Sequence, residues 1–336
     1  MTLLRTASLA LLASCGFAAR LCAQGPTFAF AEDTTYADAP HVAGMTAVAE
    51  TLPAYETQLQ HAATLLLRSR DPERRAAAFD TLANALPRAT ALPGGRDYAF
   101  AKLQGVSQVA DPAGAWRIFT WQHFVNDSTY RYGGLYVPAD ASAPTVALTD
   151  GAQAKGVETD FELRADEWYG VVYYGVRAFT LGDGRPAWVL FGYDADAYAH
   201  RRKVADVLSF DRRGRPRFGA EVFVGSERFP ELTQSRLVLE YRTDARVRLN
   251  YDEALGGIVH DRLVPGPPIR AGGPAAYVPD GSYDGYVLDA EAGLWRYREE
   301  YFDRVISAEP PRPNPVLGGG KEARDLFGRS RPRGLR

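Results

Sequence analysis

The part of the chain just after residue 50 carries apolar residues at helical spacing. Steps of three and four residues place one set on a single helix face: Leu52, Tyr55, Leu59, Ala62 and Leu66. A second set follows Asp71, which suits an N-terminal cap, and Pro72, which suits a first helical turn: Phe79, Leu82 and Leu86. Pro87 and then Gly94-Gly95 are expected to end this second helix. The pattern predicts a helical hairpin over residues 51–90, packed on a sheet.

From residue 97 to residue 305 the pattern changes to short runs with turn signals between them. Apolar and polar residues alternate in 237–241 and again in 247–251, and Thr243-Asp244 lies between, which predicts a half-exposed antiparallel hairpin. Residues 168–174 are apolar on both faces and predict a central strand. Asp211-Arg212-Arg213-Gly214 is typical of a hairpin loop. Further strands are expected at 116–124, 130–137, 145–148, 168–180, 187–193, 204–210, 218–224, 258–263, 286–288 and 294–301.

These runs predict a mainly β fold. Many short strands without helices between them indicate an antiparallel, multi-stranded sandwich or barrel, with a propeller-like arrangement as the alternative, preceded by the short α-helical hairpin. The predicted organisation is a signal peptide at 1–23, an extended lead-in at 24–50, the hairpin at 51–90, the antiparallel β domain at 97–305 and a disordered Pro/Gly/Arg-rich tail at 306–336.

The first residues resemble a secretory signal. Arg5 precedes the apolar run 7–19, which is too short to span a bilayer, and Ala23-Gln24 is a suitable cleavage junction. Leu12-Ala13-Ser14-Cys15 offers a second interpretation, a lipoprotein anchored through Cys15. The expected location is therefore outside the cytoplasm: periplasmic, surface-bound or secreted. No later segment has the length and apolarity of a transmembrane helix.

Composition excludes several classes of function. The formal net charge of -2 gives no electrostatic footprint for nucleic acid. Both cysteines, Cys15 and Cys22, lie in the signal segment, so the mature chain would have no thiol nucleophile and no thiolate-bound metal. The sequence has neither a Gly-x-Ser-x-Gly elbow nor a His-Glu-x-x-His motif. No catalytic residue and no organic cofactor is predicted.

One acidic segment has the spacing of a calcium loop. Asp280, Ser282, Asp284 and Glu291 occupy its oxygen-ligand positions, and Gly285 lies where such a loop turns sharply. The alternative is a tight Asp-Gly turn with Asx-type capping. It is favoured because Tyr283 and Leu288 lie where calcium loops prefer small or polar residues, and because the flanking segments have the pattern of strands.

A second group of candidate ligand-binding residues follows the apolar run 187–193. Asp194, Asp196 and His200 would form a metal or sugar site at a strand end, and a polar loop is the alternative. Four tryptophans are candidate platforms for a sugar ring or an aromatic ligand, although most are expected in the core: Trp121, Trp168, Trp188 and Trp295.

An ordered set of short motifs resembles a known family: Trp116–Gln122, Trp168-Tyr169-Gly170, Leu190–Asp194, Asp206–Phe210 and Pro279–Gly285. The set is similar to that of an uncharacterised family of exported proteins from Bacteroidetes-type bacteria, over about residues 97–301. The resemblance implies export and a single β unit. It implies no activity and no catalytic residue, and the Pro/Gly/Arg tail departs from it.

Three functional hypotheses follow, of which the third is a structural component of the envelope held by a lipidated Cys15. The first is a non-catalytic protein of the cell envelope or exterior that binds a ligand or partner, such as an envelope polymer or another protein, through its β scaffold. The second is a hydrolase acting on envelope or extracellular polymer, for which the fold would have to bring two carboxylates face to face.

Overall fold

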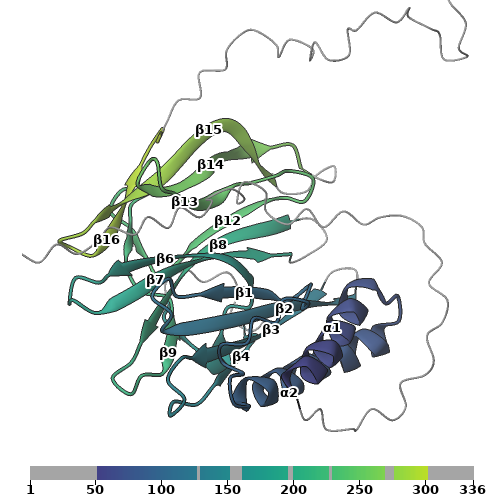
Figure 1. Ribbon diagram of the computed structural model, residues 1–336. Helices are drawn as coiled ribbons and strands as arrows, with labels where there is room; N and C mark the ends of the chain where they lie inside the picture. The colour runs from purple at the N-terminus through teal and green to yellow at the C-terminus, as the bar shows by residue number, and fades with distance from the viewer. Residues whose placement is uncertain are drawn as a thin grey trace, which may run out of the picture.

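The computed structural model describes residues 51–126, 129–151, 161–195, 200–226, 229–268 and 276–301. Over these residues the chain forms two α-helices, a short 3-10 helix (Ala165–Glu167) and three sheets, with the α-helices and the sheets stacked in four layers (Figure 1). The helices cover the outer face of the first sheet, and the third sheet lies at the opposite end of the stack. The predicted mainly β fold with a preceding helical hairpin is confirmed, as an open layered sandwich. The predicted signal peptide, lead-in and tail lie outside the described residues.

The helical layer consists of α1 (Leu52–Arg68) and α2 (Pro72–Ala91). The Asp71 side chain caps α2 by accepting hydrogen bonds from the first free N–H groups, as predicted. The prediction that Pro87 ends α2 is wrong, because the helix continues to Ala91. A helical proline removes the hydrogen bond to the carbonyl four residues back, here that of the exposed Ala83, which water can solvate. Neither helix is long and apolar enough to cross a membrane.

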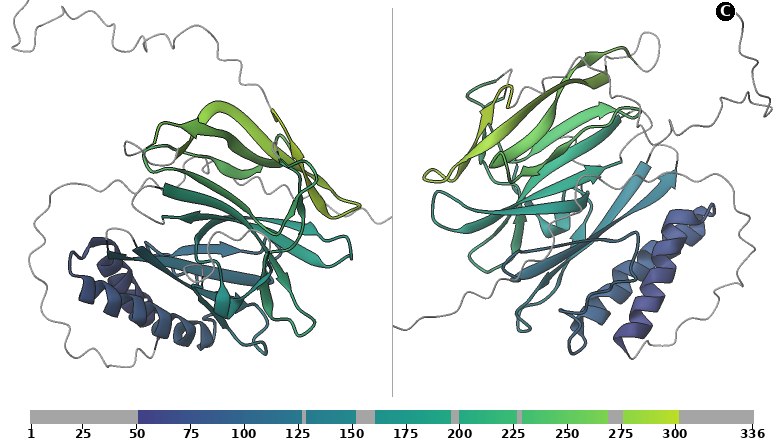
Figure 2. Two further views of the ribbon diagram at one scale, coloured as in Figure 1. Left: turned by 180° about the vertical axis from the view of Figure 1, so that it is seen from behind. Right: turned by 45° about the horizontal axis from the view of Figure 1, so that its top comes forward.

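The first sheet has the order β1 (Ser107–Ala110), β2 (Trp116–Asn126), β3 (Thr129–Pro138) and β4 (Val146–Thr149), all antiparallel. Alternate residues of β2 point to opposite faces. Phe119 and Trp121 pack against the helices, whereas Trp116 and Ile118 pack against the second sheet. Both faces of this sheet are therefore buried, with α1 and α2 on one of them (Figure 2).

The second sheet has the order β5-β9-β8-β7-β6, and β12 pairs with the first half of β8. Its central strands β7 and β8 are apolar on both faces. Leu190 and Val204 pack in the core between the first and second sheets, and Val189 and Val207 pack in the core between the second and third sheets. The predicted loop at residues 211–214 joins β8 to β9. The strands are β5 (Leu163–Arg164), β6 (Val172–Thr180), β7 (Pro186–Asp194), β8 (His200–Phe210), β9 (Pro216–Phe218) and β12 (Leu237–Arg242).

The third sheet has the order β11-β10-β16-β15-β14-β13, with every pair antiparallel except β10 and β16. Phe223, Ile258 and Trp295 pack from this sheet against the second sheet. The strands are β10 (Phe223–Val224), β11 (Thr233–Gln234), β13 (Leu249–Asp252), β14 (Gly257–Gly266), β15 (Ala276–Asp289) and β16 (Leu294–Arg298).

The predicted hairpin of 237–241 and 247–251 is wrong in its pairing. β12 pairs with β8 in the second sheet, and β13 pairs with β14 in the third. The alternation itself is correct, since Leu237, Tyr241 and Leu249 are buried. The alternation shows which face of a strand is buried, but it does not show which strand is the partner. Two strands from different sheets that face the same core can both show it.

Two further strand predictions are wrong in detail. Residues 168–171 precede β6, which is an edge strand and not a central one, although Trp168 and Val171 are fully buried. The predicted strand 218–224 is split into β9 and β10 at Gly219, whose φ of +95° carries the chain from the second sheet to the third.

Candidate functional site

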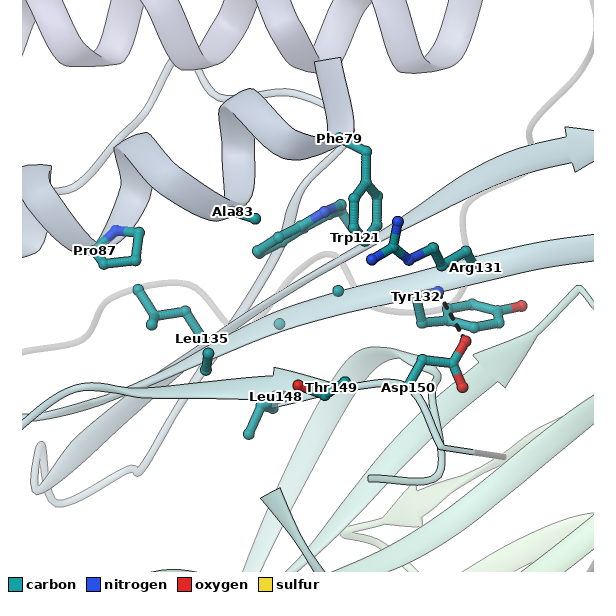
Figure 3. Close-up of a pocket in the computed structure, with 13 residues that line it drawn as sticks. Phe79, Ala83, Pro87, Trp121, Arg131, Tyr132, Leu135, Leu148, Thr149 and Asp150 are labelled. Carbon is teal, nitrogen blue, oxygen red and sulfur yellow. Dashed lines mark hydrogen bonds between the residues drawn. The ribbon is translucent and has the colours of Figure 1, made fainter. Parts of the chain in front are cut away.

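A pocket of about 190 Å³ lies between α2 and the first sheet (Figure 3). Helix α2 forms one side of it with Phe79, Ala83 and Pro87. Strands β2, β3 and β4 form the rest of the lining: Trp121, Arg131, Tyr132, Gly133, Gly134, Leu135, Ala147, Leu148 and Thr149, together with Asp150. We call this the α2 pocket.

Two consecutive glycines in β3 leave the backbone bare on both faces of the first sheet, Gly133 on the helix side and Gly134 on the side of the second sheet. Gly133 lies opposite Trp121 in the β2–β3 register, and a Cβ at Gly133 would come within 2.6–2.7 Å of the indole ring, including Nε1. A Cβ at Gly134 would come within 2.9 Å of Leu148. Because glycine has no side chain, the indole packs directly on the β3 backbone.

An aromatic ring and a cation meet at one end of the pocket. The Phe79 ring centroid lies 6.0 Å from that of Trp121, and the Arg131 guanidinium carbon lies 4.5 Å from the Phe79 centroid. Figure 3 shows the three side chains gathered at this end, with Pro87 and Leu135 at the other. Arg131 itself is exposed, so its charge stays hydrated while its planar group covers the ring.

The Trp121 indole N–H is a buried donor without an acceptor. Trp121 is 2% exposed, and no hydrogen-bond partner for Nε1 exists among the described residues. Leaving a buried donor unpaired costs about 1–3 kcal/mol. The nitrogen itself packs on the Gly133 backbone and does not open onto the pocket.

His123 lies two residues along β2, on the same face as Trp121. Both its ring nitrogens are buried and without partners in the described part of the chain. Burial lowers the pKa of His123, and the nearby Arg75 and Arg131 lower it further, while Asp80 acts in the opposite direction. His123 is therefore neutral at neutral pH.

Asp150 is the one acidic residue among the described residues that line the pocket. Its Oδ2 accepts a hydrogen bond from the Tyr132 backbone N–H at 3.0 Å. Its Oδ1 lies 2.5 Å from the position that a Cβ at Gly170 would take, so the carboxylate packs against the Gly170 backbone. A single carboxylate held in this way does not make the facing pair that a glycosidase needs.

The predicted group Asp194, Asp196 and His200 is only partly assembled. Asp194 and His200 belong to one polar network but are joined through Arg202 and Glu240. The Arg202 guanidinium lies 3.2 Å from Asp194 and 2.8 Å from Glu240, which in turn lies 3.2 Å from His200 Nδ1. Asp196 lies outside the described residues.

The buried end of this network reaches the first sheet. The Tyr132 hydroxyl donates to Asp194 Oδ1 at 2.6 Å and accepts from the Ala195 N–H at 2.7 Å. Burial raises the pKa of Tyr132 far above its usual value, and Asp194 raises it further, so the hydroxyl keeps its proton. Asp194 thus fastens the second sheet to the first, which is a structural task. Its role as a ligand-binding residue stays a prediction.

The predicted calcium ligands are spread along β15 and the turn that follows it. Asp280 Oδ1 accepts hydrogen bonds from the backbone N–H and the hydroxyl of Ser282, as Asx-type capping predicts. Asp284 is buried and accepts from the Tyr297 hydroxyl at 2.8 Å and the Glu300 N–H at 3.0 Å. Glu291 lies in the turn between β15 and β16.

The described residues contain no group of three or more histidine, cysteine, aspartate or glutamate side chains arranged to hold a metal. Residues 280–282 form a bulge within β15 and not a turn before a strand, because they lie opposite Arg262 alone. Calcium binding stays a prediction that this geometry does not support.

Sequence reasoning missed most of the α2 pocket. Of the four candidate tryptophans, Trp168, Trp188 and Trp295 are buried in the cores between sheets, and Trp121 alone of the four lines the pocket. Arg131 belongs to no sequence motif that would have marked it as a site residue. The available signal was Gly133-Gly134 inside a strand otherwise rich in tyrosine, since glycine in a strand often marks a close approach.

Comparisons with family models, with curated proteins and with solved structures found no match to this chain.

Proposed function

We propose that this chain is an exported, non-catalytic binding protein of the cell envelope or exterior, and that the α2 pocket holds a small organic ligand. The observation that carries the proposal is the pocket itself, a space of about 190 Å³ between α2 and the first sheet with aromatic, apolar and cationic side chains in its wall.

The lining also has the composition of a small-molecule site. Apolar and aromatic side chains predominate, and a few polar groups at one end are available to set orientation. Export rests on the signal-like first residues and on the family resemblance. The hydrolase hypothesis has no comparable support, because Asp150 is the sole carboxylate among the described pocket residues.

Ligand-observed NMR with a library of small organic fragments tests the proposal. Ala83 is exposed and lines the pocket, so Ala83→Phe places a ring in the space that a ligand would use. Ala76→Phe is the matched control, because Ala76 is also exposed on α2 but does not line the pocket. We expect fragments to bind the unmodified chain and Ala76→Phe, and to lose binding to Ala83→Phe.

The proposal is overturned if no fragment binds the unmodified chain at millimolar concentration. It is equally overturned if bound fragments remain bound to Ala83→Phe, since they would then occupy another surface.

A further inference from the structure

We propose that Lys203 is a covalent capture site for small aldehydes, which it binds as an imine. The uncharged amine adds to the carbonyl carbon, and the carbinolamine that forms then loses water. The carbonyl oxygen leaves with both amine hydrogens, so the step needs no oxidant and no other reactant. This site is independent of the α2 pocket, because Lys203 belongs to β8 of the second sheet and does not line that pocket.

The Lys203 side chain points into the interface between the second and third sheets. Ala205 and Val207 follow it at two-residue steps on β8 and pack in the core between these sheets, so Lys203 shares their face. Its neighbours in the register are Tyr193 on β7 and Leu239 on β12. Lys203 is partly exposed, whereas Ala205 and Val207 are fully buried, so it lies where this core reaches the surface.

Two tyrosine rings face the Lys203 nitrogen. Nζ lies 4.3 Å from the ring centroid of Tyr174 and 5.3 Å from that of Tyr193. The Tyr174 hydroxyl donates a hydrogen bond to the Leu249 carbonyl at 2.6 Å, which fixes this ring between the second and third sheets. The face of a ring attracts an ammonium group but donates no hydrogen bond to the lone pair of the neutral amine. That lone pair is therefore free to attack a carbonyl carbon.

No carboxylate neutralises Lys203 within the described residues. Over the same residues, no hydrogen bond or ion pair joins Nζ to another side chain or to the backbone. Burial lowers the pKa of Lys203 to about 8. An ordinary lysine has a pKa of about 10.4, so at pH 7 the uncharged fraction of Lys203 is roughly a hundredfold larger than that of an ordinary lysine. A desolvated lysine with a depressed pKa is the form in which this side chain acts as a nucleophile.

The Lys203 nitrogen is also accessible. Trp121 Nε1 and both ring nitrogens of His123 are shielded from solvent and have no partner, whereas Nζ of Lys203, equally without a partner in the described ranges, is not shielded. A small aldehyde can therefore reach the amine from solvent. The ring faces of Tyr174 and Tyr193 are apolar surfaces against which its hydrocarbon part can pack.

The residue type at this position matters for the chemistry. The chain has 39 lysine and arginine residues, and four of them are lysines: Lys102, Lys155, Lys203 and Lys321. A guanidinium group keeps its proton in proteins and cannot attack a carbonyl carbon, whereas an amine can lose its proton and do so. An unprotonated imine carries no charge, so the burial that disfavours the ammonium form does not oppose the product.

Reductive trapping with propanal and cyanoborohydride tests the inference. Cyanoborohydride reduces the imine to a stable propyl-lysine, and peptide mass spectrometry of the full chain locates it. With limiting propanal at pH 7, we expect Lys203 to be modified at least about tenfold faster than Lys102, which is exposed. Without cyanoborohydride, the adduct should disappear on dilution, because imine formation is reversible.

Two matched variants identify the amine. Lys203→Arg keeps the positive charge and removes the nucleophile, so the fast modification should be lost. Lys102→Arg makes the same exchange at the exposed lysine and should leave the modification of Lys203 unchanged.

Modification of Lys203 no faster than that of Lys102 overturns the inference, and so does a fast modification that persists in Lys203→Arg. Neither result affects the fragment-binding test of the α2 pocket. If Lys203→Arg does not fold, the comparison of the two lysines within the unmodified chain still decides the question.

Discussion

At the residue scale, the fully buried Asp206 and Arg236 form an ion pair inside the second sheet. Arg236 Nε lies 3.3 Å from Asp206 Oδ1, and both side chains are 0% exposed. The Tyr173 hydroxyl donates to Asp206 Oδ2 at 2.9 Å and accepts from Trp168 Nε1 at 2.8 Å. Every strong polar group here has a partner, which is the condition under which buried charge is tolerated.

Breaking this pair should be costly. Asp206→Asn leaves the Arg236 charge buried without its counter-ion, and we expect the free energy of unfolding to fall by about 3–5 kcal/mol. Arg236→Met should cost a similar amount. Denaturant unfolding of the two single variants and the double variant measures the coupling, and the double variant should lose less than the sum. Additive losses, or single losses below about 1 kcal/mol, would contradict this account.

His123 predicts a pH dependence of stability. Burial, and then Arg75 and Arg131, lower its pKa in the folded chain below the ordinary value of 6.5. Between that lowered pKa and 6.5 the unfolded chain binds more protons than the folded chain, so stability falls as the pH falls through this window. We expect His123→Leu to lose less stability on acidification than the unmodified chain.

Urea unfolding at a series of pH values from 7.5 to 4.5 measures this difference. His61→Leu is the control, since His61 is exposed on α1, and it should follow the pH profile of the unmodified chain. Parallel profiles for His123→Leu and the unmodified chain would show that His123 titrates alike in both states.

At the element scale, the bulge in β15 gives the acidic segment a structural role, because Asp280 caps it through hydrogen bonds to Ser282. Gly281 has φ of +96°, and Asp280 caps the Ser282 N–H and hydroxyl. We expect Asp280→Ala to lower the free energy of unfolding by about 1 kcal/mol, the usual worth of such hydrogen bonds. The loss should be the same in millimolar calcium and in excess chelator. A melting temperature of the unmodified chain that rises with calcium would support the predicted calcium site.

The elements also show what sequence patterns can predict here. The helical stripe from Leu52 to Leu66 gave the correct helix and the correct buried face, because three- and four-residue spacing depends only on local geometry. The alternation in 237–251 gave the correct buried residues and the wrong partner strand. Pairing depends on which sheet each strand enters, and a two-residue period does not encode that choice.

The candidate site was harder to predict for the same reason. Its lining comes from α2, β2, β3 and β4, so no local spacing relates Phe79 to Trp121 or either of them to Arg131. Asp194 and His200, which are close in sequence, proved to be parts of a network completed by Glu240 from another strand. Carboxylate spacing identified polar side chains, and the layer packing determined what they contact.

At the scale of the whole molecule, the helical hairpin is a structural layer as well as a wall of the pocket. It covers Phe119, Trp121, Leu135 and Val137, each at most 2% exposed. We expect a chain lacking residues 51–95 to aggregate or to bind the dye ANS strongly, because a contiguous apolar face would meet water. The full chain is the control. A soluble, cooperatively unfolding deletion variant without dye binding would show that the three sheets suffice.

The path of the chain between β9 and β13 limits how the protein can be divided into separate structural units. The polypeptide leaves the second sheet after β9, supplies β10 and β11 to the third, returns for β12 and crosses again to β13. No single cut releases either sheet with all its strands. Each of the two sheets is built from separate segments of the sequence. A single break in the gene therefore cannot duplicate, exchange or remove one sheet alone. This half of the molecule must be gained, folded and inherited as a unit.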